Sequence, residues 1–66
     1  MATISGFVGE NDARVVVIDT TTWLVEKNEI KDFGNYSFTG LTSNQKIVLF
    51  IRDDGELIGF GKVSPY

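Results

Sequence analysis

Apolar and polar residues alternate along much of this chain with the two-residue period of a β-strand. The clearest example is the segment 36–41, in which Tyr36 and Phe38 share one face while Ser37 and Thr39 share the other. No window of 11 residues shows the spacing of an amphipathic helix. The pattern therefore predicts an all-β protein.

Turn-forming residues divide the chain into six short predicted strands. The strands are expected over residues 3–8, 13–19, 23–29, 36–41, 46–52 and 56–63. Asp32, Phe33 and Gly34 fit a three-residue hairpin loop, and Asp53, Asp54 and Gly55 fit a second hairpin. Six strands in 66 residues predict a single domain, 1–66, built as a sandwich or barrel.

Two of the predicted strands are apolar on both faces. If Ala13, Val15 and Val17 face the core, and if Ile47, Leu49 and Ile51 do the same, other apolar side chains must point away from it. An antiparallel sheet with one solvated face should carry polar residues on that face. The sequence therefore predicts a protein interface. Its residues are Phe7, Val16, Ile18, Val48 and Phe50.

Composition and charge exclude several classes of partner. The chain has a net charge of -3 with only six Lys and Arg, too few cations for a nucleic-acid or membrane-surface binder. Its longest apolar run, residues 47–51, is too short to span a bilayer. Without cysteine or histidine, disulfides and common metal sites cannot stabilise so small a domain, which favours oligomerisation or docking on a larger body.

Chemistry-bearing residues are sparse. Without histidine or cysteine, catalysis would need paired carboxylates in a pocket, but Asp53, Asp54 and Glu56 fall in a predicted exposed turn. The same carboxylates offer hard ligands to calcium, although their spacing matches no EF-hand loop. We therefore predict no catalytic residue, no metal site and no cofactor. Trp23 is either a platform for carbohydrate or a core residue packed on the glycines of the last strand.

Four segments together resemble a known family. Residues 4–8, 13–17, 32–41 and 47–49 follow in order the pattern of carboxypeptidase regulatory-like domains, whose most specific part is the segment from Asp32 to Leu41. These are transthyretin-like (prealbumin-like) sandwiches, found in surface adhesins and in bacteriophage virion proteins. The resemblance implies a small antiparallel Greek-key β-sandwich of six to seven strands, similar to an immunoglobulin-like fold.

The resemblance also implies a non-enzymatic role. Such domains serve as structural and adhesion modules, and the first residues of this chain lack the features of a signal peptide. We therefore expect a bacteriophage virion component, either decorating the capsid or associated with the tail or its fibres. It would be made in the host cytoplasm and would dock or oligomerise through an apolar sheet face. The alternative is a carbohydrate- or peptide-binding module that belongs to a larger secreted protein.

Overall fold

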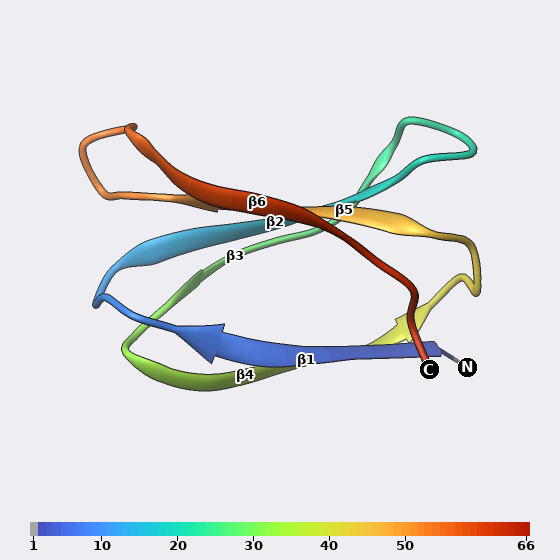
Figure 1. Ribbon diagram of the computed structural model, residues 1–66, viewed down its shortest axis with the longest axis horizontal. Coiled ribbons are helices and arrows are strands. Elements are labelled where there is room, and N and C mark those ends of the chain that lie inside the picture. Colours follow the sequence, from blue (N-terminus) through green and yellow to red (C-terminus); the bar gives the residue numbers. More distant parts are fainter. Residues whose placement is uncertain (1) are drawn as a thin grey trace.

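The computed structural model describes residues 2–66 as antiparallel β-strands in two layers (Figure 1). The strands are β1 (Ala2–Val8), β2 (Ala13–Asp19), β3 (Val25–Lys31), β4 (Gly34–Leu41), β5 (Lys46–Ile51) and β6 (Leu57–Val63). Residues 2–66 contain no helix, and so none that could cross a membrane. The all-β prediction is confirmed, and each predicted strand is present with shifts of a few residues at its ends.

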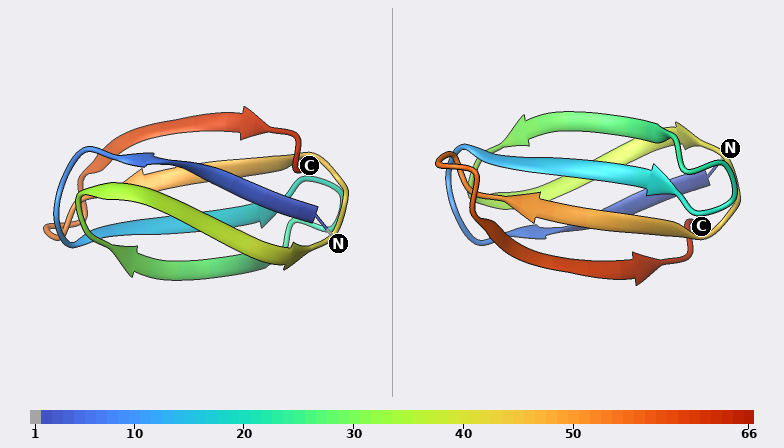
Figure 2. Two further views of the ribbon diagram at one scale, coloured as in Figure 1. Left: turned by 90° about the horizontal axis from the view of Figure 1, so that it is seen from below. Right: turned by 90° about the horizontal axis from the view of Figure 1, so that it is seen from above.

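The two sheets differ in size. One pairs β1 with β4, and the other has the order β3-β2-β5-β6. Figure 2 shows the two-stranded sheet lying across the larger one, with β3 and β6 at the two borders of the larger sheet. The smaller sheet is therefore too narrow to cover the whole inner face of its partner.

The predicted hairpin at residues 32–34 is wrong, because β3 and β4 belong to different sheets. Asp32 does accept a backbone hydrogen bond, but its donor is Asp12, in the loop between β1 and β2, at 3.2 Å. Phe33 donates its backbone N–H to the side chain of Asn11 in that same loop at 3.0 Å. These two loops therefore hold each other where the chain passes between the sheets. Gly34 begins β4 at a φ of 132°, a conformation that favours glycine.

The predicted hairpin around Gly55 is confirmed, since β5 and β6 pair antiparallel on either side of it. Gly55 adopts a φ of 91° and donates its backbone N–H to the carbonyl of Arg52 at 2.9 Å. A positive φ is available to glycine without the steric cost of a side chain. The Asp-Gly signal therefore identified a true tight turn.

The core lies between the sheets and draws on four strands. As predicted, Ala13, Val15 and Val17 of β2 are fully buried, and Tyr36 and Phe38 of β4 face them. The buried hydrophobic residues of this cluster are Ala2, Ile4, Val8, Ala13, Val15, Val17, Tyr36, Phe38, Leu41 and Val48. Most are small or β-branched, as expected where two sheets pack face to face.

The orientation predicted for β5 is wrong. Val48 is buried in the core and Phe50 packs against it, whereas Ile47, Leu49 and Ile51 lie on the opposite face. An alternating strand with apolar residues on both faces does not itself indicate which face is inside. The buried Lys46 identifies the inner face of β5, because it alternates with Val48 and Phe50 and so shares a face with them.

Gly6 of β1 makes room for a core aromatic ring. It pairs with Tyr36, and a Cβ atom added at Gly6 would lie 2.7 Å from the Tyr36 hydroxyl oxygen and 2.9 Å from its ring carbons. Real Cβ atoms do not approach so closely, so any side chain at this position must displace the ring.

We expect Gly6→Ala to lower the free energy of unfolding by about 1–3 kcal/mol, since the added methyl group overpacks the core. Urea unfolding followed by tyrosine fluorescence or circular dichroism measures the change. Gly61→Ala is the matched control, because a Cβ at Gly61 meets no atom within 4 Å. Equal urea midpoints for the two variants would show that the contact with Tyr36 is not restrictive.

Candidate interaction surface

The outer face of the four-stranded sheet is apolar along all four strands. In its middle row, Val16 lies between Asn28 and Leu49, and Leu49 lies beside Phe60. Directly paired residues point to the same side of a sheet, so the ladders identify the other members of this face. We call the following residues the outer apolar face: Val16, Ile18, Val25, Ile30, Ile47, Leu49, Ile51, Leu57 and Phe60.

Solvent reaches this face unevenly. Phe60 is 72% exposed, and Val25, Ile30 and Leu57 are each more than half exposed. Val16, at the centre, is only 8% exposed because its neighbours on β3 and β5 cover it. The centre of this face is therefore packed by its own neighbours, whereas its margins expose apolar side chains, as at a surface that interacts with a partner.

The charged side chains on this face are cationic. Within the four strands, the sheet pairing places Arg14 beside Ile30 and Ile51, and Lys62 beside Ile47. Arg14 also donates a hydrogen bond from its guanidinium to the side-chain oxygen of Asn28 at 2.7 Å, which holds it flat along the sheet. The face therefore combines apolar residues with two positive charges, although the whole chain is negative.

The structure divides the predicted interface residues into three groups. Val16 and Ile18 belong to the outer apolar face. Val48 and Phe50 point inward, so their assignment to the interface is wrong. They share the inner face of β5 with the buried Lys46. Phe7 is exposed, as predicted, but it lies on the other sheet, where its ring packs edge-on against Phe33 at 5.1 Å between centroids.

Most residues of the outer apolar face were missed by the sequence prediction. The alternating residues of β5 (Ile47, Leu49 and Ile51) were assigned to the core instead, and Phe60 was not singled out. The available signal was Lys46 at the start of β5: a lysine that alternates with Val48 and Phe50 cannot share an apolar core unless acidic groups meet it there.

Lys46 is fully buried and is neutralised by two carboxylates. Its Nζ lies 3.1 Å from Asp19 Oδ2, at the end of β2, and also forms an ion pair with Glu26, at the start of β3. The Thr42 hydroxyl oxygen lies 2.9 Å from one oxygen of each carboxylate, and Asn44 donates its side-chain amide to Asp19 at 3.3 Å. This group of five residues, the Lys46 cluster, joins β2, β3, β5 and the loop after β4.

The Lys46 cluster keeps its ionised state through hydrogen bonding. The N–H of Thr21 donates to Asp19 at 2.7 Å, and this bond contributes most to holding the pKa of Asp19 well below its usual range. The hydrogen bond from Lys46 likewise lowers the pKa of Glu26. Burial acts to lower the pKa of Lys46, but its bonds to Glu26 and Asp19 outweigh that effect and raise it.

These properties suit a structural role. Every buried side-chain nitrogen and oxygen atom in residues 2–66 has a hydrogen-bond partner, and the atoms of the Lys46 cluster find theirs within the cluster or on nearby backbone. Its three charged groups neutralise one another in large part, which offsets the cost of removing them from water. The cluster thus fixes the end of the sandwich at which three strands and a loop meet.

The acidic turn before β6 is occupied by its own hydrogen bonds. Asp54 accepts the backbone N–H of Glu56 at 2.9 Å, as an aspartate in a tight turn commonly does. Glu56 also lies within 3.7 Å of Arg52, which forms a closer pair with Glu10 at 2.9 Å. Residues 2–66 contain no group of three acidic, histidine or cysteine side chains able to hold a metal ion.

Trp23 does not pack on the glycines of β6, so that alternative is wrong. It lies in the loop between β2 and β3, where its side chain is 67% exposed and its backbone has a φ of 61°. The backbone N–H of Trp23 donates to the backbone carbonyl of Asp19 at 2.7 Å, so this loop is directly linked to the Lys46 cluster. Leu24 beside it is also exposed, which gives the loop tip two apolar side chains.

Comparison of the chain with protein-family models, with curated proteins and with solved structures found no match.

We expect Lys46→Met to lower the free energy of unfolding by about 3 kcal/mol, since it leaves two carboxylates close together without their cation. Chemical unfolding at neutral pH measures the loss. In the control Lys31→Met, a partly exposed pair with Glu29 at 3.0 Å is removed, and the loss should stay below about 1 kcal/mol. Similar small losses for both variants would contradict a structural role for the Lys46 cluster.

Proposed function

We propose that this chain is a non-enzymatic structural module that docks on a protein partner through the outer apolar face. The observation that carries this proposal is the run of apolar side chains across all four strands of a face that no other part of residues 2–66 covers. A solvated antiparallel sheet normally has polar residues there. A contiguous apolar patch with polar surroundings is typical of an interaction site.

The size of the domain favours the same conclusion. A chain of 66 residues buries a modest fraction of its surface, and this one has no disulfide to supplement its core. Covering the outer apolar face would add roughly 25 cal/mol for each Å² of apolar area removed from water, before the cost of association. Docking would therefore stabilise the fold as well as attach it.

The charges on the face indicate the chemistry of the partner. Arg14 and Lys62 both belong to this face, so a partner surface with carboxylates opposite these two positions pairs best with it. A second copy stacked face to face brings the same two kinds of cation into one interface. The proposal therefore favours a different protein, with an apolar surface bordered by acidic residues.

The more specific form of the proposal places the module in a bacteriophage virion, on the capsid or on the tail and its fibres. It rests on the resemblance of residues 4–8, 13–17 and 32–41 to transthyretin-like domains found in such particles, and it includes their Greek-key sandwich topology. Two antiparallel sheets connected by loops that pass from one layer to the other are compatible with that topology. Cosedimentation of the purified chain with candidate particles tests this form of the proposal.

A carbohydrate-binding module is the second candidate, and the exposure of Trp23 favours it. An exposed indole ring offers the flat apolar surface on which a sugar ring can pack. A glycan array compared between the unchanged chain and Trp23→Ala separates this function from docking through the sheet, because Trp23 lies in a loop outside the outer apolar face.

For docking through the sheet, we expect Phe60→Glu to weaken partner binding at least about tenfold while the chain stays folded. Phe60 is 72% exposed in the free chain, so its replacement removes little folding energy, but the new carboxylate would repel an acidic partner surface. Binding to the partner or particle is measured by analytical ultracentrifugation.

Phe33→Glu is the matched control, since it alters an exposed phenylalanine outside the four-stranded sheet. Phe33→Glu should leave partner binding intact. Equal binding by both variants would show that docking does not use the outer apolar face.

A further inference from the structure

One edge of β1 has unpaired backbone groups. Thr3 exchanges two backbone hydrogen bonds with Tyr66, at 2.7 and 2.9 Å, on the side of β1 that faces away from β4. In a strand, alternate residues direct their N–H and C=O to the same side, so Ser5 and Phe7 share this side with Thr3. Within residues 2–66, β1 pairs with β4 alone, which leaves those groups of Ser5 and Phe7 free.

The space beside this edge lies over the inner face of β6. Gly59 pairs with Phe50 and Gly61 with Val48, so both glycines point toward the inside of the sandwich. A Cβ added at Gly61 would meet nothing within 4 Å, and one at Gly59 would only reach van der Waals contact with the Phe50 ring at 3.9 Å. The two-stranded sheet therefore has no strand above β6, as Figure 2 shows.

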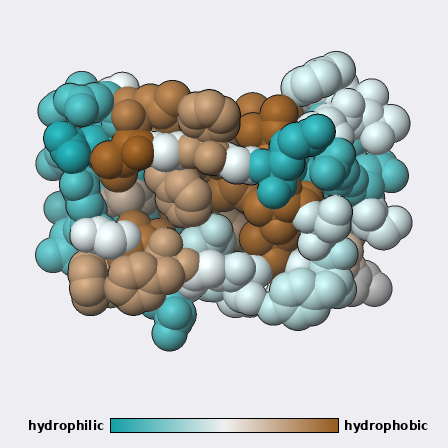
Figure 3. Space-filling model, viewed as in Figure 1, coloured by the Kyte–Doolittle hydropathy of each residue, from teal (hydrophilic) through white to brown (hydrophobic). Residues whose placement is uncertain are grey.

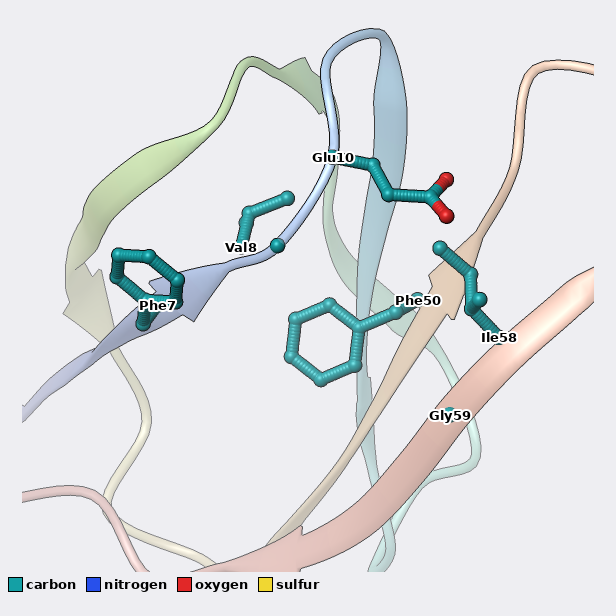
Figure 4. A pocket seen from close by; sticks show the side chains of 7 residues that line it. Phe7, Val8, Glu10, Phe50, Ile58 and Gly59 are labelled. Carbon is teal, nitrogen blue, oxygen red and sulfur yellow. The ribbon is translucent and has the colours of Figure 1, made fainter.

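A cavity of about 320 Å³ lies at one end of this space (Figure 4). Phe7 and Val8 line it from β1, Phe50 from β5, and Ile58 and Gly59 from β6. Figure 3 looks onto this side of the molecule and shows hydrophobic residues over β6 and between the two layers. We call this cavity, together with the open space beside Gly59 and Gly61, the β1–β6 groove.

We propose that the β1–β6 groove accepts a short extended segment of a partner polypeptide, which pairs with Ser5 and Phe7 as a third strand of the small sheet. Tyr66 already pairs with the same edge of β1, which shows that this edge can form a ladder. Because Tyr66 occupies this edge beside Thr3, the segment is limited to about the length of β1 beyond Thr3. Strand addition of this kind takes its affinity from main-chain hydrogen bonds and its specificity from alternate side chains.

The groove also indicates the side chains of the segment. Gly59 and Gly61 leave open space beside Phe50 and Val48, and Ile58 borders that space at one end, so the segment must supply large apolar side chains at alternate positions to fill it. The other positions face solvent and suit threonine or other polar residues. β1 carries no charged side chain, so charge on the segment is not needed next to it.

The β3 edge and a second copy of the chain fit less well. The β3 edge carries Glu26, Lys27, Glu29 and Lys31, and charged side chains on an edge strand oppose pairing with another chain. β1 has neither charge nor proline to prevent it. The β1 strand of a second copy could align with this edge, but its Ile4 and Val8 are buried in their own core and could not fill the groove.

The probe is the blocked peptide Lys-Leu-Thr-Leu-Lys, whose two leucines lie on one face of a strand and whose lysines and threonine lie on the other. We expect it to slow amide hydrogen exchange of Ser5 and Phe7 at least about tenfold, measured by NMR on the full chain. Without the peptide these two amides should exchange faster than those of Ile4 and Gly6, which are bonded to β4. The isomer Lys-Thr-Leu-Leu-Lys, with leucines on opposite faces, should bind more weakly.

Gly61→Leu fills the groove from below and should abolish peptide binding, whereas Lys62→Leu, on the opposite face of the same strand, should leave it intact. A peptide N-methylated on the amides that face β1 should also fail, which tests the pairing without altering the protein. Binding that persists in Gly61→Leu or with the N-methylated peptide would overturn the proposal. So would protection of Ser5 and Phe7 that rises with protein concentration alone, or no protection at millimolar peptide.

The groove and the outer apolar face lie on opposite sides of β6. Phe60→Glu should therefore leave binding of the peptide unchanged, so the strand-addition proposal and the docking proposal fail or succeed separately. Peptide-induced shifts confined to Leu49 and Phe60 would overturn strand addition at the β1–β6 groove.

Discussion

The burial of Lys46 between Asp19 and Glu26 is the constraint on which the rest of this structure depends. A lysine whose side chain is fully buried is stable only where acidic groups pair with it. Those groups are Asp19, at the end of β2, and Glu26, near the start of β3. Once Lys46 faces inward, strand alternation places Val48 and Phe50 inward and Leu49 outward. One ion cluster therefore determines both the composition of the core and the character of the surface.

The difference in width between the sheets explains the two proposed surfaces. Four strands carry more apolar side chains than a two-stranded sheet can cover, because β5 is apolar on both faces. On the outside, the excess forms the outer apolar face. On the inside, the uncovered border at β6 carries Gly59 and Gly61 between Ile58 and Val63, and these two glycines leave the β1–β6 groove open.

The sequence was sufficient to predict the strands, the Asp-Gly hairpin and the inner face of β2, because each depends on local pattern. It was not sufficient to predict how strands pair. The turn at Gly34 has the composition of a hairpin loop, yet β4 leaves its neighbour in sequence and pairs with β1, where Gly6 accommodates Tyr36. Alternation alone also could not orient β5, which is apolar on both faces, so Val48 and Phe50 were assigned to the wrong face. Val16 and Ile18 lie on β2, and their face was predicted correctly.

The absence of cysteine from the chain allows one direct test of this account. Single variants Leu49→Cys and Val48→Cys place a thiol on opposite faces of β5, and their reaction with a maleimide is followed in the native protein. The account predicts that Leu49→Cys reacts readily and that Val48→Cys reacts only as the chain unfolds. Rapid reaction of Val48→Cys with protection of Leu49→Cys would contradict the orientation of β5, and with it the role given to Lys46 and the outer apolar face.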